Sequence, residues 1–427
     1  MANDMDVSIC RTYSERMAQK SILEKLAVLS DAAKYDASCA SSSAPRRSSA
    51  DGKGLGSTEG MGICHSYAPD GRCISLLKIL MTNFCIFDCA YCINRVSSNV
   101  VRARFTVEEI VWLTIEFYRR NYIEGLFLSS GIIRSPDDTM SEMVRVAKVL
   151  RLDHGFKGYI HLKTIPDAAQ ELINEAGLYA DRLSINVELP TDASLVSFAP
   201  QKDAASIRKA MAGVRLKQEE CAEPTLRTKR IKTFAPAGQS TQLIVGADGA
   251  SDTTILAGSQ RLYSGYKLKR VYYSAFSPIP DASNLLPLIK PPLMREHRLY
   301  QADWLLRFYG FSVDEIASGT DTGMLDLAID PKLAWALRQR GAFPVDINRA
   351  ERAMLLRVPG LGAKVVARIV RARRYKRLGF ADLLRLGARM KNAKAFVIAA
   401  DWRPLELSDR DDLRSLFAPP AEQLSLL

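Results

Sequence analysis

Short apolar segments alternate with amphipathic segments through the middle of the chain, from about residue 70 to residue 275. The short apolar runs predict buried strands, and apolar residues spaced every three or four positions predict helices. The predicted strands are 73–81, 125–131, 159–164, 182–189, 242–245 and 270–275, and the predicted helices are 106–120, 136–150, 167–176, 203–219 and 253–265. Thr106 and Glu109 form a capping box at the start of the first of these helices. Six strand–helix units in a row predict an α/β fold with a parallel sheet that closes, fully or partly, into a barrel.

The flanking parts of the chain have a different pattern. A helix is expected over residues 14–36, and the Ser- and Gly-rich stretch 38–62 is expected to be a loop. Five prolines between residues 277 and 292 mark a domain junction. Helices are expected at 294–309, 312–318 and 331–339, with short helices joined by turns from 346 onward. The predicted domains are therefore 1–62, 63–283 (the barrel), 284–340 (linker helices), 341–400 (a helical domain) and 401–427 (a tail).

The composition is that of an ordinary globular protein, with 427 residues of which 47% are apolar and 25% charged. No stretch approaches the roughly 18 uninterrupted apolar residues of a membrane span. The first residues lack the apolar core of a secretory signal, so a cytoplasmic location is expected. Because the cytoplasm is reducing, the eight cysteines are interpreted as ligands, catalytic thiols or buried side chains rather than as disulfides.

The net charge of +12 is concentrated in one segment. Residues 349–397 contain fourteen Lys and Arg but only two acids, which is an excess of +12 and equals that of the whole chain. A basic module attached to an almost neutral body predicts a polyanionic partner for that module alone.

Three cysteines lie close together in the run Cys85-Ile86-Phe87-Asp88-Cys89-Ala90-Tyr91-Cys92. Three thiolates in one loop indicate a soft metal ion or an iron–sulfur cluster. A four-iron cluster would keep one iron open for an exchangeable ligand. A structural zinc site needs four ligands, and Cys64, Cys73 or His65 could supply the fourth. On spacing alone both interpretations stay open.

The position of this loop favours the cluster, because it follows the first strand of the barrel-like series and Tyr91 directly precedes its last cysteine. Over about residues 70–280 the chain resembles the radical S-adenosylmethionine (SAM) superfamily. The resemblance implies a partial (β/α)6 barrel in which Cys85, Cys89 and Cys92 bind a [4Fe–4S] cluster. It also implies that SAM binds the open iron and is cleaved reductively to a 5′-deoxyadenosyl radical, with a flavodoxin or ferredoxin as electron donor.

The resemblance places further residues near the cosubstrate. Ser129, Ser130 and Gly131 end the second strand, where the family has a Gly-Gly-Glu-like run that contacts the methionine amine. This chain has no acid there, so main-chain carbonyls would take over that contact. Tyr91 and Gly246 are expected beside the adenine.

Four more polar positions are cofactor-binding or catalytic candidates. Ser184, Asn186 and Glu188 alternate along the fourth predicted strand and would share one face. That face could hydrogen-bond the ribose and the methionine moiety, or it could be ordinary polar lining. Lys163, on the third strand, is a candidate catalytic residue, and a solvated or structural lysine is the alternative.

The remaining cysteines allow several roles. Cys39, Cys64 and Cys73, with His65, could ligate a second cluster, and a thiol at Cys64 or Cys39 could donate a hydrogen atom, which makes Cys64 a second catalytic candidate. Buried, unreactive thiols are the alternative. The other two, Cys10 and Cys221, are unremarkable, although a lone cysteine in the cavity could also return a hydrogen atom.

Two predicted short helices flank the turn Pro359-Gly360-Leu361-Gly362 in the basic segment. Gly360 and Gly362 allow main-chain amides at the second helix N-terminus to approach a phosphate, and Lys364 and Arg368 add positive charge. The pattern resembles the helix–hairpin–helix motif, which holds the DNA backbone without reading bases. A second hairpin of this kind at 380–391 lacks the second glycine in its turn and is expected to be mainly structural. The alternative to a DNA-binding region is a basic helical bundle that docks on a protein.

Several runs resemble a bacterial family of DNA modification or repair radical SAM proteins. They are 32–36, 118–131, Ala237-Gly238-Gln239-Ser240-Thr241-Gln242 and Arg270-Val271-Tyr272-Tyr273-Ser274. The resemblance implies a uracil-DNA-glycosylase-like partner protein and a radical enzyme acting on DNA. An RNA-modifying radical SAM enzyme and a non-catalytic, metal-stabilised nucleic-acid-binding protein are the alternatives.

Overall fold

The structure is a computed structural model, and it describes residues 20–33, 62–67, 73–222, 233–279, 284–317, 322–404 and 412–418. Most of the predicted N-terminal segment, including Cys10 and Cys39, and most of the predicted tail lie outside these residues. The chain divides into two compact units, one made of residues 1–249 and 261–291 and the other of 250–260 and 292–427. The predicted linker helices therefore belong to the same unit as the basic segment.

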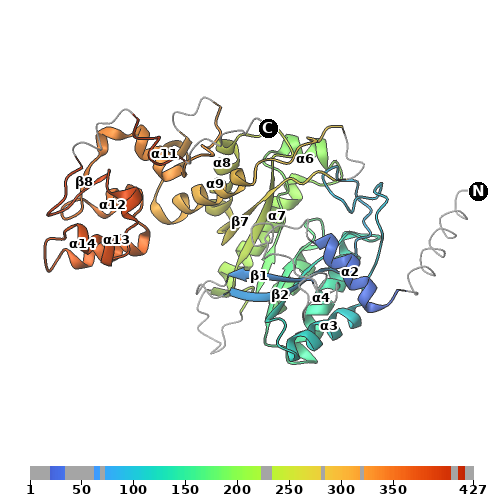
Figure 1. Cartoon of the computed structure of the whole chain (residues 1–427). Helices are drawn as coiled ribbons and strands as arrows, with labels where there is room; N and C mark the ends of the chain where they lie inside the picture. The colour runs from blue at the N-terminus through green and yellow to red at the C-terminus, as the bar shows by residue number, and fades with distance from the viewer. Residues whose placement is uncertain are drawn as a thin grey trace, which may run out of the picture. The chain divides into compact units, whose positions relative to one another are not determined.

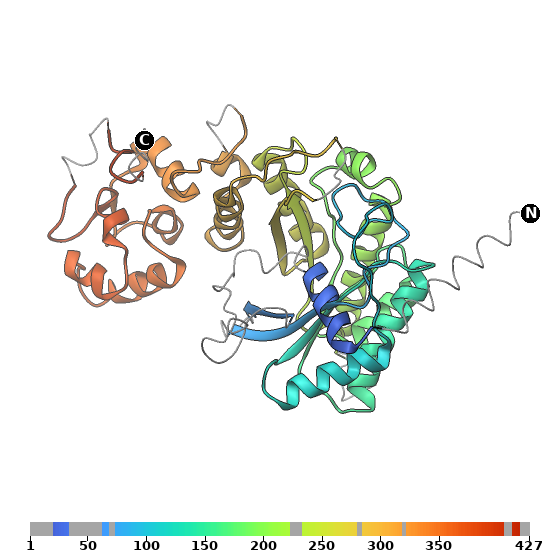
Figure 2. The same cartoon turned by 45° about the vertical axis from the view of Figure 1, so that its right-hand side comes forward.

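The first unit contains a seven-stranded sheet whose strands follow one another in chain order. The strands are β1 (Ile63–Tyr67), β2 (Cys73–Leu80), β3 (Gly125–Ser129), β4 (Tyr159–Lys163), β5 (Arg182–Ser184), β6 (Gln239–Val245) and β7 (Arg270–Ala275). Strands β2 to β7 are all parallel. The strand direction turns steadily from β2 to β7, so the sheet curls into a half-barrel (Figures 1 and 2). The predicted partial barrel of six parallel strands is confirmed.

Helices connect successive parallel strands and cover one face of the sheet (Figure 1). They are α3 (Val107–Arg119), α4 (Pro136–Leu152), α5 (Gln170–Tyr179), α6 (Asp192–Phe198), α7 (Ala204–Ala222) and α8 (Asp252–Tyr266), and α2 (Ile22–Ala32) precedes the sheet. The capping box of α3 is confirmed, because Thr106 Oγ1 accepts a hydrogen bond from the Glu109 amide at 3.2 Å and the Thr106 amide donates to Glu109 at 2.9 Å. Fully buried leucine and isoleucine side chains between helices and strands form the core.

Two features of the sheet differ from the prediction. Strand β1 was not predicted; it is short and largely polar, and it pairs antiparallel with β2 at the sheet edge. The predicted strand 182–189 is wrong beyond Ser184, where β5 ends. The backbone there no longer alternates regularly, since Glu188 has φ +63° in the left-handed region.

The second unit is mainly helical. Its elements are α9 (Leu293–Trp304), the π-helical turn η2 (Leu305–Tyr309), α10 (Val313–Ala317), α11 (Pro331–Arg338), η3 (Arg340–Ala342), α12 (Arg352–Arg357), α13 (Ala363–Ala372), α14 (Phe380–Arg385) and α15 (Met390–Ala393). Two short parallel strands, β8 (Val345–Asp346) and β9 (Val397–Ile398), bring the two ends of the basic segment together. No described helix is long and apolar enough to cross a membrane.

Candidate functional site

The three cysteines lie in an irregular loop that begins just after β2, at the carboxyl end of the parallel sheet. Such folds place their ligand sites at this edge, because the loops after all the parallel strands meet there. The loop therefore starts where the topology favours a binding site.

One arginine side chain holds the two ends of this loop together. The Arg102 guanidinium donates to the carbonyl of Asn83, to that of Asn94 at 2.9 Å, to that of Arg95 at 2.6 Å and to that of Ser98 at 2.9 Å. Each hydrogen bond to a charged group contributes about 1.5–3 kcal/mol. The planar five-donor fork of arginine suits such multiple bonding, and a lysine ammonium does not reproduce it.

Two further contacts hold the base of the loop, one within the loop segment itself and one with a residue that follows β3. The Asn83 side chain accepts from the Ala103 amide and donates to the Val101 carbonyl, both at 2.8 Å. Gly131, after β3, lies so close to the loop that a Cβ there would be 2.2 Å from the Phe84 carbonyl oxygen. Only glycine allows this approach, which explains the glycine at the end of the second parallel strand.

The thiols of this loop are surrounded by donors and by apolar side chains. The Phe87 amide donates to Cys85 Sγ and the Asn94 amide to Cys92 Sγ, both at 3.4 Å. Hydrogen bonds of this kind tune the sulfurs of cluster-bound cysteines. Burial raises the pKa of the Cys92 thiol to about 12 and raises the pKa of the Cys89 thiol, whereas coordination to a metal deprotonates a thiol outright.

Among the residues that the structure describes, no three His, Cys, Asp or Glu side chains are grouped to hold one metal ion. A four-iron cluster binds its thiolates through separate irons, so its ligands lie farther apart than those of a single zinc ion. Cys73, a proposed zinc ligand, is exposed at the start of β2.

A cavity of about 180 Å³ lies against the loop, and the three cysteines and Tyr91 line it. The Tyr91 hydroxyl is buried, and burial raises its pKa well above the usual value. It interacts with the Cys89 thiol, and this contact works against the rise in the pKa of that thiol. The cavity therefore has a buried polar group beside the three thiols.

An ion pair faces the same cavity. Lys202 Nζ donates to Glu188 Oε1 at 2.7 Å, and the two side chains are only 18% and 10% exposed. Lys202 also lies 5.8 Å from the centre of the Tyr91 ring. The backbone of Glu188 is hydrogen-bonded to Gln242 and Ile244, which holds its left-handed conformation in place.

The structure brings most of the predicted cofactor residues together. Ser130, Gly131, Lys163, Asn186 and Glu188 line the cavity beside the cysteines. The predicted regular strand is wrong beyond Ser184, where β5 ends. Asn186 nevertheless lines the main cavity with Glu188 and a smaller space with Ser184, and its Nδ2 donates to Gln242 Oε1 at 3.3 Å.

Four other candidates lie elsewhere. Ser129 is buried one residue before the cavity wall. Ser184 and Cys64 line a smaller space of about 20 Å³, which shares Lys163, Asn186 and Gln242 with the main cavity. Gly246, with φ +78°, lines a separate open hollow rather than the cavity of the cysteines.

Three residues of the site were not identified from the sequence. Arg102 and Lys202 lie in irregular segments, and the residues next to them in the sequence do not indicate which distant residue they contact. Asp167 also lines the cavity, and burial raises the pKa of its carboxyl while Lys202 opposes the shift.

In the second unit, α12 and α13 flank the predicted glycine turn. Gly360 has φ +79°, and a Cβ there would lie 2.5 Å from the Arg389 carbonyl oxygen, so the turn requires glycine. Gly362 is the N-cap of α13, and Lys364 and Arg368 are exposed one turn apart on that helix. Arg368 also donates to the Leu386 carbonyl at 3.1 Å.

A buried lysine lies beneath this turn. Lys332 is only 8% exposed, its ammonium donates to the Leu361 carbonyl at 2.6 Å, and it lies 4.7 Å from the centre of the Tyr309 ring. Burial lowers its pKa from 10.5 to about 7, against an opposing effect of Asp330.

A scan against protein-family models and a search of curated proteins both give no match. Among solved structures, the chain is similar to HydG, a maturase of the [FeFe]-hydrogenase, with 14% identity and a TM-score of 0.40 over 53% of this chain and 48% of that one. It is also similar to methylornithine synthase (PylB), with 14% identity and a TM-score of 0.38 over 65% and 67%. The aligned part thus spans about half the length of HydG. At this identity the likeness concerns the course of the backbone only.

Arg102→Lys should weaken metal retention, because an ammonium cannot bond the four carbonyls that the guanidinium joins. Iron retained after anaerobic reconstitution and incubation with a chelator would measure the effect. Arg104→Lys is the matched control, since Arg104 pairs with Glu142 instead. Equal iron loss in both variants would contradict the role assigned to Arg102.

Lys332→Met should flatten the dependence of stability on pH. Because the folded pKa of Lys332 lies below its unfolded value, the unfolded chain binds more protons between about pH 7 and pH 10. This lysine therefore makes the free energy of unfolding rise with pH in that window, by up to about 1.4 kcal/mol per pH unit. Denaturant unfolding followed by tryptophan fluorescence suits the test, with the exposed Lys391→Met as control. A profile unchanged in Lys332→Met would show that this lysine does not titrate there.

Proposed function

We propose that the chain is a radical SAM enzyme that acts on DNA. The radical SAM part of this proposal is supported by the cysteine loop. The loop follows the first parallel strand of a half-barrel and borders a partly polar cavity. The amides directed at two sulfurs fit a cluster, and the buried Lys202–Glu188 ion pair in the cavity wall fits a polar cosubstrate.

In this proposal Cys85, Cys89 and Cys92 hold a [4Fe–4S] cluster. With SAM bound and one electron delivered by a reduced flavodoxin or ferredoxin, such a cluster would supply reductive cleavage of SAM to methionine and a radical able to take a hydrogen atom from the substrate. The Lys202 ammonium would bind the methionine carboxylate, and the Glu188 carboxylate would bind the methionine amine. Glu188 would thus take the role of the acid that the family has after the second parallel strand and that this chain lacks after β3. The apolar cavity walls exclude water from a reactive radical.

The reconstituted, dithionite-reduced protein should release 5′-deoxyadenosine from SAM, and Cys89→Ala should abolish the release because it removes a cluster ligand. Liquid chromatography with mass spectrometry measures the product. Cys221→Ala, at the end of α7, is the matched control and should retain the activity. A fully iron-loaded wild-type protein that releases no 5′-deoxyadenosine would refute the proposal.

The proposed binding to DNA rests on residues of the second unit. Exposed Lys364 and Arg368 follow the glycine turn. The Ala363 amide at the start of the ten-residue helix α13 donates to the Tyr309 hydroxyl, so the following amides of the first turn and the helix dipole would favour a phosphate there. These groups fit the backbone of a duplex and carry no base information.

Lys364→Ala should weaken binding to duplex DNA about equally for all sequences and reduce the slope of log Kd against log salt by about 1. Fluorescence anisotropy across a salt series measures both quantities. Lys209→Ala, an exposed lysine of α7 in the other unit, serves as the control. An unchanged slope would remove Lys364 from the interface, and tighter binding to duplex RNA than to DNA would favour the RNA alternative.

A further inference from the structure

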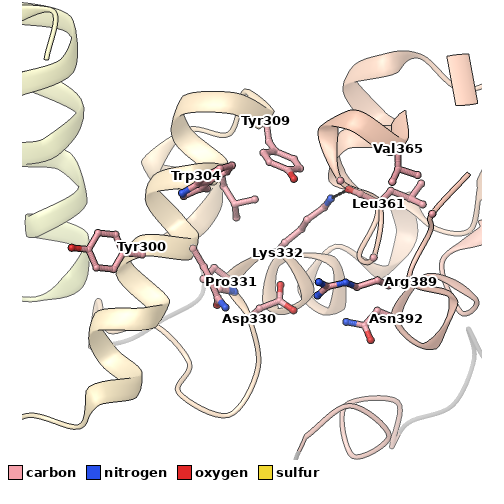
Figure 3. A pocket seen from close by; sticks show the side chains of 15 residues that line it. Tyr300, Trp304, Tyr309, Asp330, Pro331, Lys332, Leu361, Val365, Arg389 and Asn392 are labelled. Atoms are coloured by element: carbon pink, nitrogen blue, oxygen red, sulfur yellow. Dashed lines mark hydrogen bonds between the residues drawn. The ribbon is translucent and has the colours of Figure 1, made fainter. Parts of the chain in front are cut away.

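A second, larger cavity lies in the helical unit, and the proposed barrel chemistry does not use it. Its volume is about 570 Å³, within the range of small-molecule sites. It lies between η2, the start of α11 and the two turns of the basic segment (Figure 3). The lining residues important here are Trp304, Tyr309, Asp330, Lys332, Arg389 and Asn392.

One wall is aromatic and partly open to solvent. Trp304 is 52% exposed, and its ring centre lies 4.9 Å from that of Phe308, which is 46% exposed. Both belong to the segment where α9 passes into the π-helical turn η2, and such turns occur frequently at functional sites. An exposed indole at the rim of a cavity is a suitable platform for a planar ring.

The same wall is attached to the proposed phosphate-binding turn. The Ala363 amide, at the start of α13, donates to the Tyr309 hydroxyl at 3.3 Å. Lys332 reaches from α11 to the Leu361 carbonyl within the turn (Figure 3). One hydrogen bond thus joins the aromatic wall to the turn and another joins α11 to it, so a ligand in the cavity would lie next to a phosphate held by the turn.

The far side of the cavity is polar. Arg389 and Asn392 extend from the second hairpin towards Asp330 (Figure 3). One Asp330 oxygen already accepts from the Leu333 amide at 3.0 Å as a helix cap, which leaves the other available. An amide and a carboxylate can pair with the mixed donors and acceptors of a base edge, and a guanidinium suits a phosphate.

We propose that this cavity binds one unpaired nucleotide of the DNA strand whose backbone the first hairpin holds. The base stacks on Trp304, its edge meets Asn392 and Asp330, and its phosphate lies near Arg389. Chemistry on a base inside a duplex requires that the base leave the stack, so a pocket for an unpaired nucleotide favours the opened substrate. This inference rests on the DNA-binding part of the proposed function.

The test compares two fluorescent duplexes that differ by one unpaired nucleotide in one strand, at constant salt, by anisotropy with the full chain. The wild type should bind the duplex with the unpaired nucleotide about tenfold more tightly than the paired one. Trp304→Ala should remove this preference and leave the Kd for the paired duplex unchanged, whereas Trp304→Phe should keep most of it.

Trp112→Ala is the matched control, because Trp112 is 51% exposed and lies on α3 of the other unit. It should keep the full preference. Binding of both duplexes with no preference, or a preference that survives in Trp304→Ala, would overturn this inference alone. Failure to bind either duplex would overturn the DNA-binding proposal as well.

Discussion

The cysteine loop depends on one charged side chain rather than on regular secondary structure. The Arg102 guanidinium bonds carbonyls at residues 83, 94, 95 and 98, and these span the segment that carries Cys85, Cys89 and Cys92. Buried carbonyls left without donors would cost free energy. This side chain therefore joins the two ends of the loop, and the Asn83 contacts and the close approach of Gly131 hold its base, so the thiols keep their positions although the residues between them are irregular.

The alternation of apolar runs and amphipathic helices was enough to predict a parallel sheet that closes fully or partly, because each element has its own local period; the partly closed form followed only from the family resemblance. The cysteine spacing was enough to indicate the loop. Contacts between residues distant along the chain could not be predicted from local sequence patterns. Lys202 pairs with Glu188 because β5 ends early and the backbone at Glu188 has a left-handed conformation. The predicted strand is too long for the same reason, since local alternation does not reveal where a strand stops, even though Asn186 still lines cavity walls with both Ser184 and Glu188.

The positively charged residues of the basic segment do not all face a partner. The composition of the segment predicts a polyanionic partner, but some of its cations form hydrogen bonds that stabilise the fold. Arg357 donates to both carboxylate oxygens of Glu315, and Arg373 donates to the carbonyls of Ile347 and Ala350. The nucleotide-sized cavity could not be predicted from the sequence, because its walls come from segments between α9 and α15 that only the folded unit brings together.

Metal analysis of anaerobically purified protein shows whether the three cysteines hold an iron–sulfur cluster. The protein should contain about four irons and four acid-labile sulfides per chain, lost together in Cys89→Ala. One zinc per chain without iron or sulfide would contradict this expectation.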